Sequence, residues 1–156
     1  MKDEYVVYKR NVCKIKGIKN DSSDKYYELV PIDDNTLKIS VPKNRSDLFR
    51  NVISSTDSEK LIRNIPSIKI IDVPDRQLEI EYNRLLNTGK LEDLVKIIKT
   101  TYLRNEDRVL NHKKIGEKDD NYFKKAERLL YNELSISLNK TVDEVKQYIC
   151  DIIEKK

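Results

Sequence analysis

The sequence has no tryptophan, only two cysteines and one histidine, and no apolar run that approaches the length of a membrane span. A spanning helix needs about 18 consecutive apolar residues, so we expect none. Cys13 and Cys150 are isolated, without a Cys-x-x-Cys pair, which argues against a disulfide framework or zinc site and favours plain buried thiols. Residues 1–4 lack the apolar core of a secretory signal, so we expect a cytoplasmic protein.

Motifs for catalysis and for nucleotide binding are also missing. His112, the only histidine, lies in a basic segment, and neither a serine or cysteine motif nor a pair of carboxylates accompanies it. The three glycines, Gly17, Gly89 and Gly116, are too far apart to form a phosphate-binding loop. We therefore predict that the protein is not an enzyme and that it uses no cofactor and no metal.

Charge is abundant instead, since 37% of the 156 residues are charged, 38% are hydrophobic and the formal net charge is +4. This composition is typical of a folded chain with a charged surface, and the length accommodates one ordinary domain or two small ones. A positive excess of this size permits contact with phosphates, but it is also common in proteins that bind no nucleic acid.

The first part of the chain alternates short apolar segments with polar turns. Polar clusters at 20–24 and 33–35 suit hairpin loops, and the apolar segments predict four strands, at residues 5–8, 12–15, 26–30 and 37–41. We expect a small, strongly bent antiparallel sheet or partial barrel. Residues 48–53 supply apolar groups to close one end of that sheet, and residues 58–65 are predicted to form a short helix.

The second part has the 3.6-residue period of amphipathic helices. One predicted helix begins at Asp75 and ends near Gly89, whose role we interpret as a left-handed cap. Further helices are predicted at 91–103, with Tyr102 packed in the core, and at 122–134, while Thr141 opens a last helix with a capping box. Residues 105–118 are predicted to be a loop or a frayed end. The fold class is thus α+β, with a sheet domain at residues 1–66 and a compact helical domain at residues 67–156.

Several short motifs follow one another along almost the whole chain. They are Val6-Val7-Tyr8, Tyr27-x-Leu29, Ile39-Ser40-Val41-Pro42, Leu48-x-Arg50-x-Val52-Ile53, Leu86-Asn87-Thr88-Gly89-Lys90-Leu91, Val95-Lys96-Ile97-Ile98-Lys99-x-x-Tyr102-x-Arg104 and Ala126-x-x-x-Leu130-x-x-Glu133-Leu134. In this order they resemble the CarD/CdnL family of bacterial transcription regulators. The resemblance implies a Tudor-like N-terminal domain that docks on the β subunit of RNA polymerase and a helical domain that contacts promoter DNA.

In that family the edge of the small sheet is added to a sheet of the polymerase, a mode that depends mainly on backbone pairing. The resemblance therefore implies a polymerase-binding segment formed by Leu37, Lys38, Ile39, Ser40, Val41, Pro42 and Lys43. Relatives commonly carry a basic residue where this chain has Ser40. Lys38 or Lys43 could supply that charge.

The larger departure concerns DNA. Relatives use a tryptophan at the start of the first helix of the helical domain as a minor-groove wedge, and that position falls here on Asp75, or on Pro74 if the turn has one extra residue. The simpler interpretation of this segment is a helix N-terminus, and the basic residues nearby could equally form a solvated surface. The resemblance implies a DNA-binding set of Pro74, Arg76, Lys96, Lys99, Lys124 and Lys125.

We therefore expect a monomeric, non-enzymatic regulator that docks on the polymerase β subunit and modulates the stability of the promoter open complex. Its contact with promoter DNA should be weak and made largely through phosphates. The alternative is a protein-interaction adaptor that binds RNA polymerase or another partner without functional DNA contact. A nucleic-acid-processing enzyme is a distant third hypothesis, because the residues for catalysis are missing.

Overall fold

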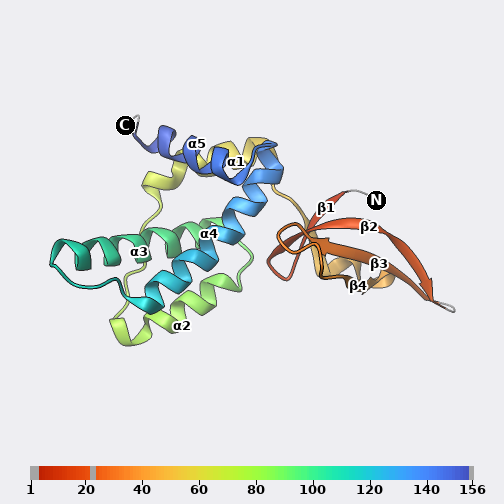
Figure 1. Ribbon diagram of the computed structural model, residues 1–156, viewed down its shortest axis with the longest axis horizontal. Helices are drawn as coiled ribbons and strands as arrows, with labels where there is room; N and C mark the ends of the chain where they lie inside the picture. Colours follow the sequence, from red (N-terminus) through yellow and green to blue (C-terminus); the bar gives the residue numbers. More distant parts are fainter. Residues whose placement is uncertain (1–3, 22–23, 155–156) are drawn as a thin grey trace.

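The computed structural model describes residues 4–21 and 24–154, in which an antiparallel sheet is followed by a helical region (Figure 1). This arrangement confirms the predicted α+β class. The elements are β1 (Tyr5–Tyr8), β2 (Asn11–Asp21), β3 (Asp24–Pro31), β4 (Ile39–Pro42), the 3-10 helix η1 (Lys43–Leu48), β5 (Phe49–Asn51), α1 (Ser55–Asn64), the 3-10 helix η2 (Ile65–Ser67), α2 (Asp75–Leu86), α3 (Leu91–Leu110), α4 (Glu117–Leu138) and α5 (Val142–Glu154).

The sheet has the strand order β4-β3-β2-β1-β5, and every neighbouring pair is antiparallel. All four predicted strands are present, but the prediction of four was wrong, because β5 adds a fifth strand against β1. The prediction missed it since β5 has only three residues, too few for an alternating pattern. Ser22 and Ser23, at the centre of the predicted 20–24 loop, lie outside the described residues.

Alternate residues of the strands form the core of the sheet, as the two-residue period requires. Cys13, Ile15, Leu29 and Val41 are among its buried members. Burial, followed by the negative charge of Asp33, raises the pKa of the Cys13 thiol to about 11, which keeps it protonated and unreactive.

The helical region has the helix caps that were predicted, but α3 is longer than predicted. Gly89 has the left-handed backbone (φ 77°) that was predicted for it. The capping box is also confirmed, since the Glu144 amide donates to Thr141 Oγ1 (3.1 Å) and the Thr141 amide to Glu144 Oε1 (2.9 Å). The predicted loop at 105–118 was too long: α3 continues to Leu110 and α4 begins at Glu117, so that only residues 111–116 form the loop.

The helical core extends further back in the sequence than the predicted domain boundary. Ile62, Ile65 and Ile68 pack in the same buried cluster as Leu86 and Leu130. Residues 55–66 were assigned with the sheet, yet α1 packs against α4 and α5. The change from the sheet core to the helical core therefore falls between β5 and α1.

The sheet and the helices are joined by an ion pair whose carboxylate is buried. Glu133 of α4, whose side chain is 2% exposed, accepts hydrogen bonds from Arg50 Nη1 (2.8 Å) and Nη2 (2.7 Å) and from the amide of Ile53 (2.9 Å). A second contact joins Arg128 of α4 to Asp33 (2.6 Å), which follows β3. Two-pronged guanidinium–carboxylate pairs fix orientation as well as distance. The position of the sheet relative to α4 is thus set by specific polar contacts.

Candidate functional site

The predicted polymerase-binding segment lies at one edge of the sheet. Its β4 part, Ile39 to Pro42, is the last strand in the order and, among the residues that the structure describes, pairs with β3 alone. Ser40 and Pro42 are exposed and Ile39 is half-buried, whereas Val41 is 1% exposed and packs in the sheet core. Val41 therefore contributes packing, and the surface is formed by the backbone of β4 and by its neighbours.

The flanking residues of this segment are accessible. Leu37 and Lys38 precede β4 as an irregular segment, and both are exposed. Lys38 Nζ lies 3.8 Å from Glu28 of β3, and the same carboxylate is 3.4 Å from Lys19. Lys43, the first residue of η1, is also exposed. An exposed apolar side chain and two exposed ammonium groups thus border the free strand.

The predicted DNA-binding residues begin at the N-terminus of α2. Pro74 occupies the cap position and Arg76 the first turn, and both are exposed. Between them Asp75, 82% exposed, accepts a hydrogen bond from Arg104 Nη1 (3.1 Å). The position where relatives place a wedge is therefore occupied by an exposed proline and by a carboxylate that is paired with α3.

The four predicted lysines do not form one surface of equivalent charges. Lys99 donates hydrogen bonds to the carbonyl oxygens of Ile65 (2.8 Å) and Ile68 (2.5 Å), so its ammonium group stabilises the end of η2. Lys96 lies 3.5 Å from Asp93, and Lys124 lies 3.0 Å from Asp120. Lys125 is exposed, and in the described part of the chain it forms no ion pair. The structure therefore does not place Lys99 in an accessible DNA-binding set.

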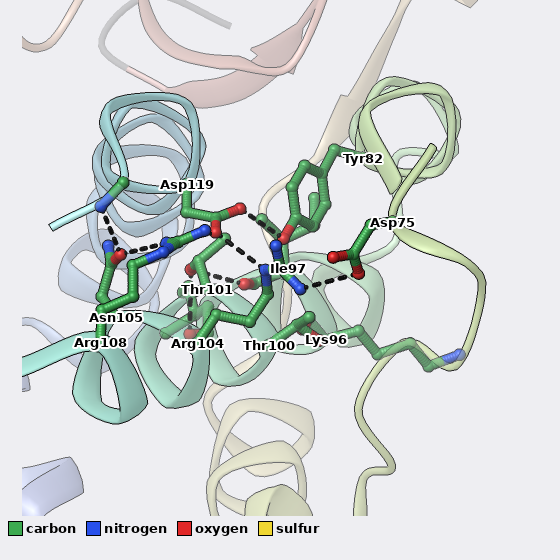
Figure 2. A network of polar contacts seen from close by, with 12 residues as sticks. Asp75, Tyr82, Lys96, Ile97, Thr100, Thr101, Arg104, Asn105, Arg108 and Asp119 are labelled. Carbon is green, nitrogen blue, oxygen red and sulfur yellow. Dashed lines mark hydrogen bonds and ion pairs between the residues drawn. The ribbon is translucent and has the colours of Figure 1, made fainter. Parts of the chain in front are cut away.

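A polar network next to this surface was not predicted from the sequence (Figure 2). Asp119, near the start of α4, is 4% exposed and accepts hydrogen bonds from Tyr82 (2.9 Å), Arg104 Nε (2.8 Å) and Arg108 Nη1 (2.7 Å). Asn105 accepts from Arg108 and from the amide of Gly116 (2.8 Å). These contacts join α2, α3 and α4, and they explain why α3 extends through a polar sequence.

The electrostatics of the network follow from its donors. Burial favours the neutral acid, but the hydrogen bonds from Arg104, Arg108 and Tyr82 outweigh burial and lower the pKa of Asp119. Burial, and then the hydrogen bond to Asp119, raises the pKa of Tyr82 above its ordinary value. Asp119 therefore stays ionised and Tyr82 stays protonated. Each group is held in the state that the contact requires, which is typical of structural stabilisation.

The sequence contains a weak signal for the buried carboxylate Glu133 but none for its partner Arg50. Glu133 falls at a core-facing position, three and four residues after Leu130 and Leu129 and beside Leu134. A carboxylate at such a position requires a partner from another element. The sequence gives no means of choosing Arg50 from among the 31 basic residues.

Other kinds of site find little support in the described residues. Within residues 4–21 and 24–154, no group of three or more His, Cys, Asp or Glu side chains is placed to hold a metal ion. Cys150 is exposed, so its prediction as a buried thiol was wrong. In the described part of the chain, no helix combines the length and apolarity that crossing a bilayer requires.

No protein-family model matches the chain, and no curated protein matches it either.

Proposed function

We propose that this protein is a non-enzymatic transcription regulator that docks on the β subunit of RNA polymerase through β4. The observation that carries the proposal is the position of β4 at the sheet edge, where β3 is its one strand partner in the described part of the chain. An extended segment of a partner can add to such an edge through main-chain hydrogen bonds. Exposed Leu37 and Lys43 flank the edge and supply apolar and charged contacts.

The other edge strand is less suited to this role. β5 has only three residues, and its Arg50 is bound to Glu133 of α4. An incoming strand there would have to approach beside the helical region. Docking at β4 instead leaves the junction intact, so that the helical region is presented in a fixed direction relative to the polymerase.

In this proposal the helical region modulates the open complex through a few phosphate contacts. Arg76 and Lys125 are the candidates with exposed charge and no ion pair among the described residues. Each such contact adds affinity that decreases with salt, without reading sequence. Because Lys96 and Lys124 have acidic neighbours within 3.5 Å and 3.0 Å, DNA binding should be weak.

The second candidate function is a polymerase-binding adaptor that makes no functional contact with DNA. Two observations favour it. Lys99 is bound to backbone carbonyls, and the position of the family's wedge holds the exposed carboxylate of Asp75, which would repel phosphates. This candidate shares the β4 docking and differs only in what the helical region does.

Docking is tested by capture of the polymerase β subunit on the immobilised full chain. Leu37→Glu with Lys43→Glu should lower affinity about tenfold or more, because the flanking contacts are lost or repelled. The matched control is Ile70→Glu with Lys60→Glu, which makes the same changes at exposed positions outside the sheet. Equal affinity of both variants and the unchanged chain would refute docking at β4.

The role of DNA is tested with polymerase and a forked promoter fragment. Arg76→Ala with Lys125→Ala should shorten the lifetime of the open complex and reduce its salt dependence. The control pair is Lys60→Ala with Lys69→Ala, which removes the same charge from other exposed positions. An unchanged lifetime, with polymerase binding intact, would favour the adaptor.

A further inference from the structure

The C-terminal end of α3 and the loop that follows it carry a band of exposed apolar side chains. Leu110 is 72% exposed and Tyr102 is 58% exposed, although Tyr102 was predicted to pack in the core. Val109 and Ile115 are each 55% exposed, and together with Phe123 of α4 these residues line a groove of about 380 Å³. We call residues 102–115 the α3 tip. Contiguous exposed apolar surface of this kind commonly marks an interaction site.

The α3 tip projects from the molecule. In Figure 1 it lies at the far end of the helical region, opposite the hairpin of β2 and β3, and no other element extends beyond it. A second macromolecule can therefore reach the tip without meeting the sheet or the edge of β4. The surface is independent of the proposed polymerase contact.

The charges of the tip are separated into two blocks. Glu106 and Asp107 precede the apolar pair Val109 and Leu110, and residues 113–114, both lysines, follow it. All four charged side chains are exposed, and none forms an ion pair with another described residue. The arginines of this segment, Arg104 and Arg108, are paired with Asp119, and Arg104 also with Asp75. Along the chain, the tip thus runs from an exposed acidic block through an apolar pair to an exposed basic block.

This pattern restricts what can cover the tip. Glu106 lines the groove together with apolar side chains and with Asp120, which is paired with Lys124; burial of Glu106 without a cation would be costly. A lipid surface is a poor occupant, because anionic headgroups would repel Glu106 and Asp107. The occupant needs an apolar centre with cations on one side and carboxylates on the other.

We propose that the occupant is the α3 tip of a second copy of this chain. In a two-fold, antiparallel contact centred on Val109 and Leu110, the acidic block of one copy lies beside the basic block of the other. This pairing occurs twice, since a two-fold interface uses the same surface on each subunit. The apolar centre supplies contact area, and the two charge blocks fix the direction.

Analytical ultracentrifugation of the full chain over a concentration series up to about 1 mM tests the dimer. The unchanged protein dimerises. Glu106→Lys with Asp107→Lys, and separately Lys113→Glu with Lys114→Glu, weaken self-association about tenfold or more, because each leaves like charges facing each other. An equimolar mixture of the two variants restores a dimer, because acidic and basic tips are complementary on both sides.

The mixture distinguishes a weakened interface from a damaged fold, because a second variant could not reverse a general effect on folding. Circular dichroism and thermal unfolding check that each variant is folded. Leu110→Ser with Ile115→Ser abolishes the dimer while leaving these measurements near those of the unchanged chain, since both side chains are exposed. A monomer at every concentration would overturn the proposal. So would a dimer that tolerates both charge reversals, or variants that fail to pair when mixed.

Discussion

Asp119 and Glu133 are two buried carboxylates on the same helix, α4, and they stabilise different parts of the molecule. Asp119 accepts from Tyr82, Arg104 and Arg108, all within the helical region. Glu133 accepts from Arg50 of β5 and from the amide of Ile53, two residues after the end of that strand. One carboxylate holds three helices together, and the other holds the sheet on the helices.

The surroundings of the two carboxylates suggest how much each contributes. Asp119 meets two guanidinium groups with side chains 30% and 27% exposed, and also the buried hydroxyl of Tyr82. Glu133 meets one guanidinium whose side chain is 42% exposed and can return to water. Loss of Asp119 should therefore be the more costly change. Loss of Glu133 should matter more for the geometry between the two halves, and hence for how the helices are presented by a docked sheet.

The largest expected effect is that of Asp119→Ala. We expect unfolding free energy to fall by about 3–5 kcal/mol, because two partly buried cations and a buried hydroxyl lose their acceptor. Chemical denaturation of the full chain measures the change. Asp120→Ala, which removes only the ion pair with Lys124, should stay within about 0.5 kcal/mol. Similar values for the two variants would contradict the assigned role of Asp119.

The next effect is that of Glu133→Ala, for which we expect a loss of about 2–3 kcal/mol. The cost should be smaller than for Asp119, because Arg50 regains water. Small-angle X-ray scattering should show a broader range of distances between the sheet and the helices. Glu127→Ala, on the same helix and 3.6 Å from Lys146, is the control and should leave the scattering unchanged. An unchanged profile for Glu133→Ala would show that the other contacts suffice.

Acid distinguishes Asp119 through its lowered pKa. A carboxyl whose pKa is lower in the folded state contributes stability that is fully present above the unfolded value, about 3.9, and that is lost as the pH falls through the folded value. The difference in unfolding free energy between the unchanged chain and Asp119→Asn should therefore be largest near neutral pH and shrink below about pH 4. Denaturation at a series of pH values measures it, and a constant difference would contradict this assignment.

Some features of the helical region could be predicted from the sequence, and others could not. Local signals identified Gly89 as a cap and Thr141 as the start of a capping box, because both depend on neighbouring residues. The length of α3 was underestimated, since its polar residues after Leu103 include Arg104 and Arg108, which are anchored on Asp119 of another helix. Such contacts depend on tertiary packing, which a residue period does not contain.

The candidate site was predictable to a similar degree. The sequence predicted a strand at 37–41, of which residues 39–41 belong to β4, but the position of β4 at the sheet edge follows from the pairing of all five strands. Lys99 was assigned to a basic surface, and the carbonyl oxygens that bind it belong to Ile65 of η2 and to Ile68 directly after it, more than thirty residues earlier. Exposure of a charge is a property of the folded chain, so a list of basic residues overestimates the accessible set.

The smallest expected losses of unfolding free energy are those of substitutions at two glycines, each of which lies near an arginine partner of one of the two carboxylates. Gly89, whose carbonyl oxygen lies 3.4 Å from Arg50 Nη2, has a φ of 77° and open space where a Cβ would lie. Gly89→Ala should cost about 1–2 kcal/mol through backbone strain alone. A Cβ on Gly116 would instead overlap the guanidinium of Arg108, and Gly116→Ala should cost about 1 kcal/mol by displacing a hydrogen-bond donor.

Double-mutant cycles measured by chemical denaturation separate these two causes. The cost of Gly116→Ala should largely vanish in an Arg108→Ala background, because the overlapping group is gone. The cost of Gly89→Ala should persist in an Arg50→Ala background, because backbone strain does not depend on that side chain. If Gly89→Ala also became neutral there, Gly89 would act through Arg50. The Glu133 junction would then be a side-chain network of the same kind as the Asp119 cluster, and the contrast between the two would be lost.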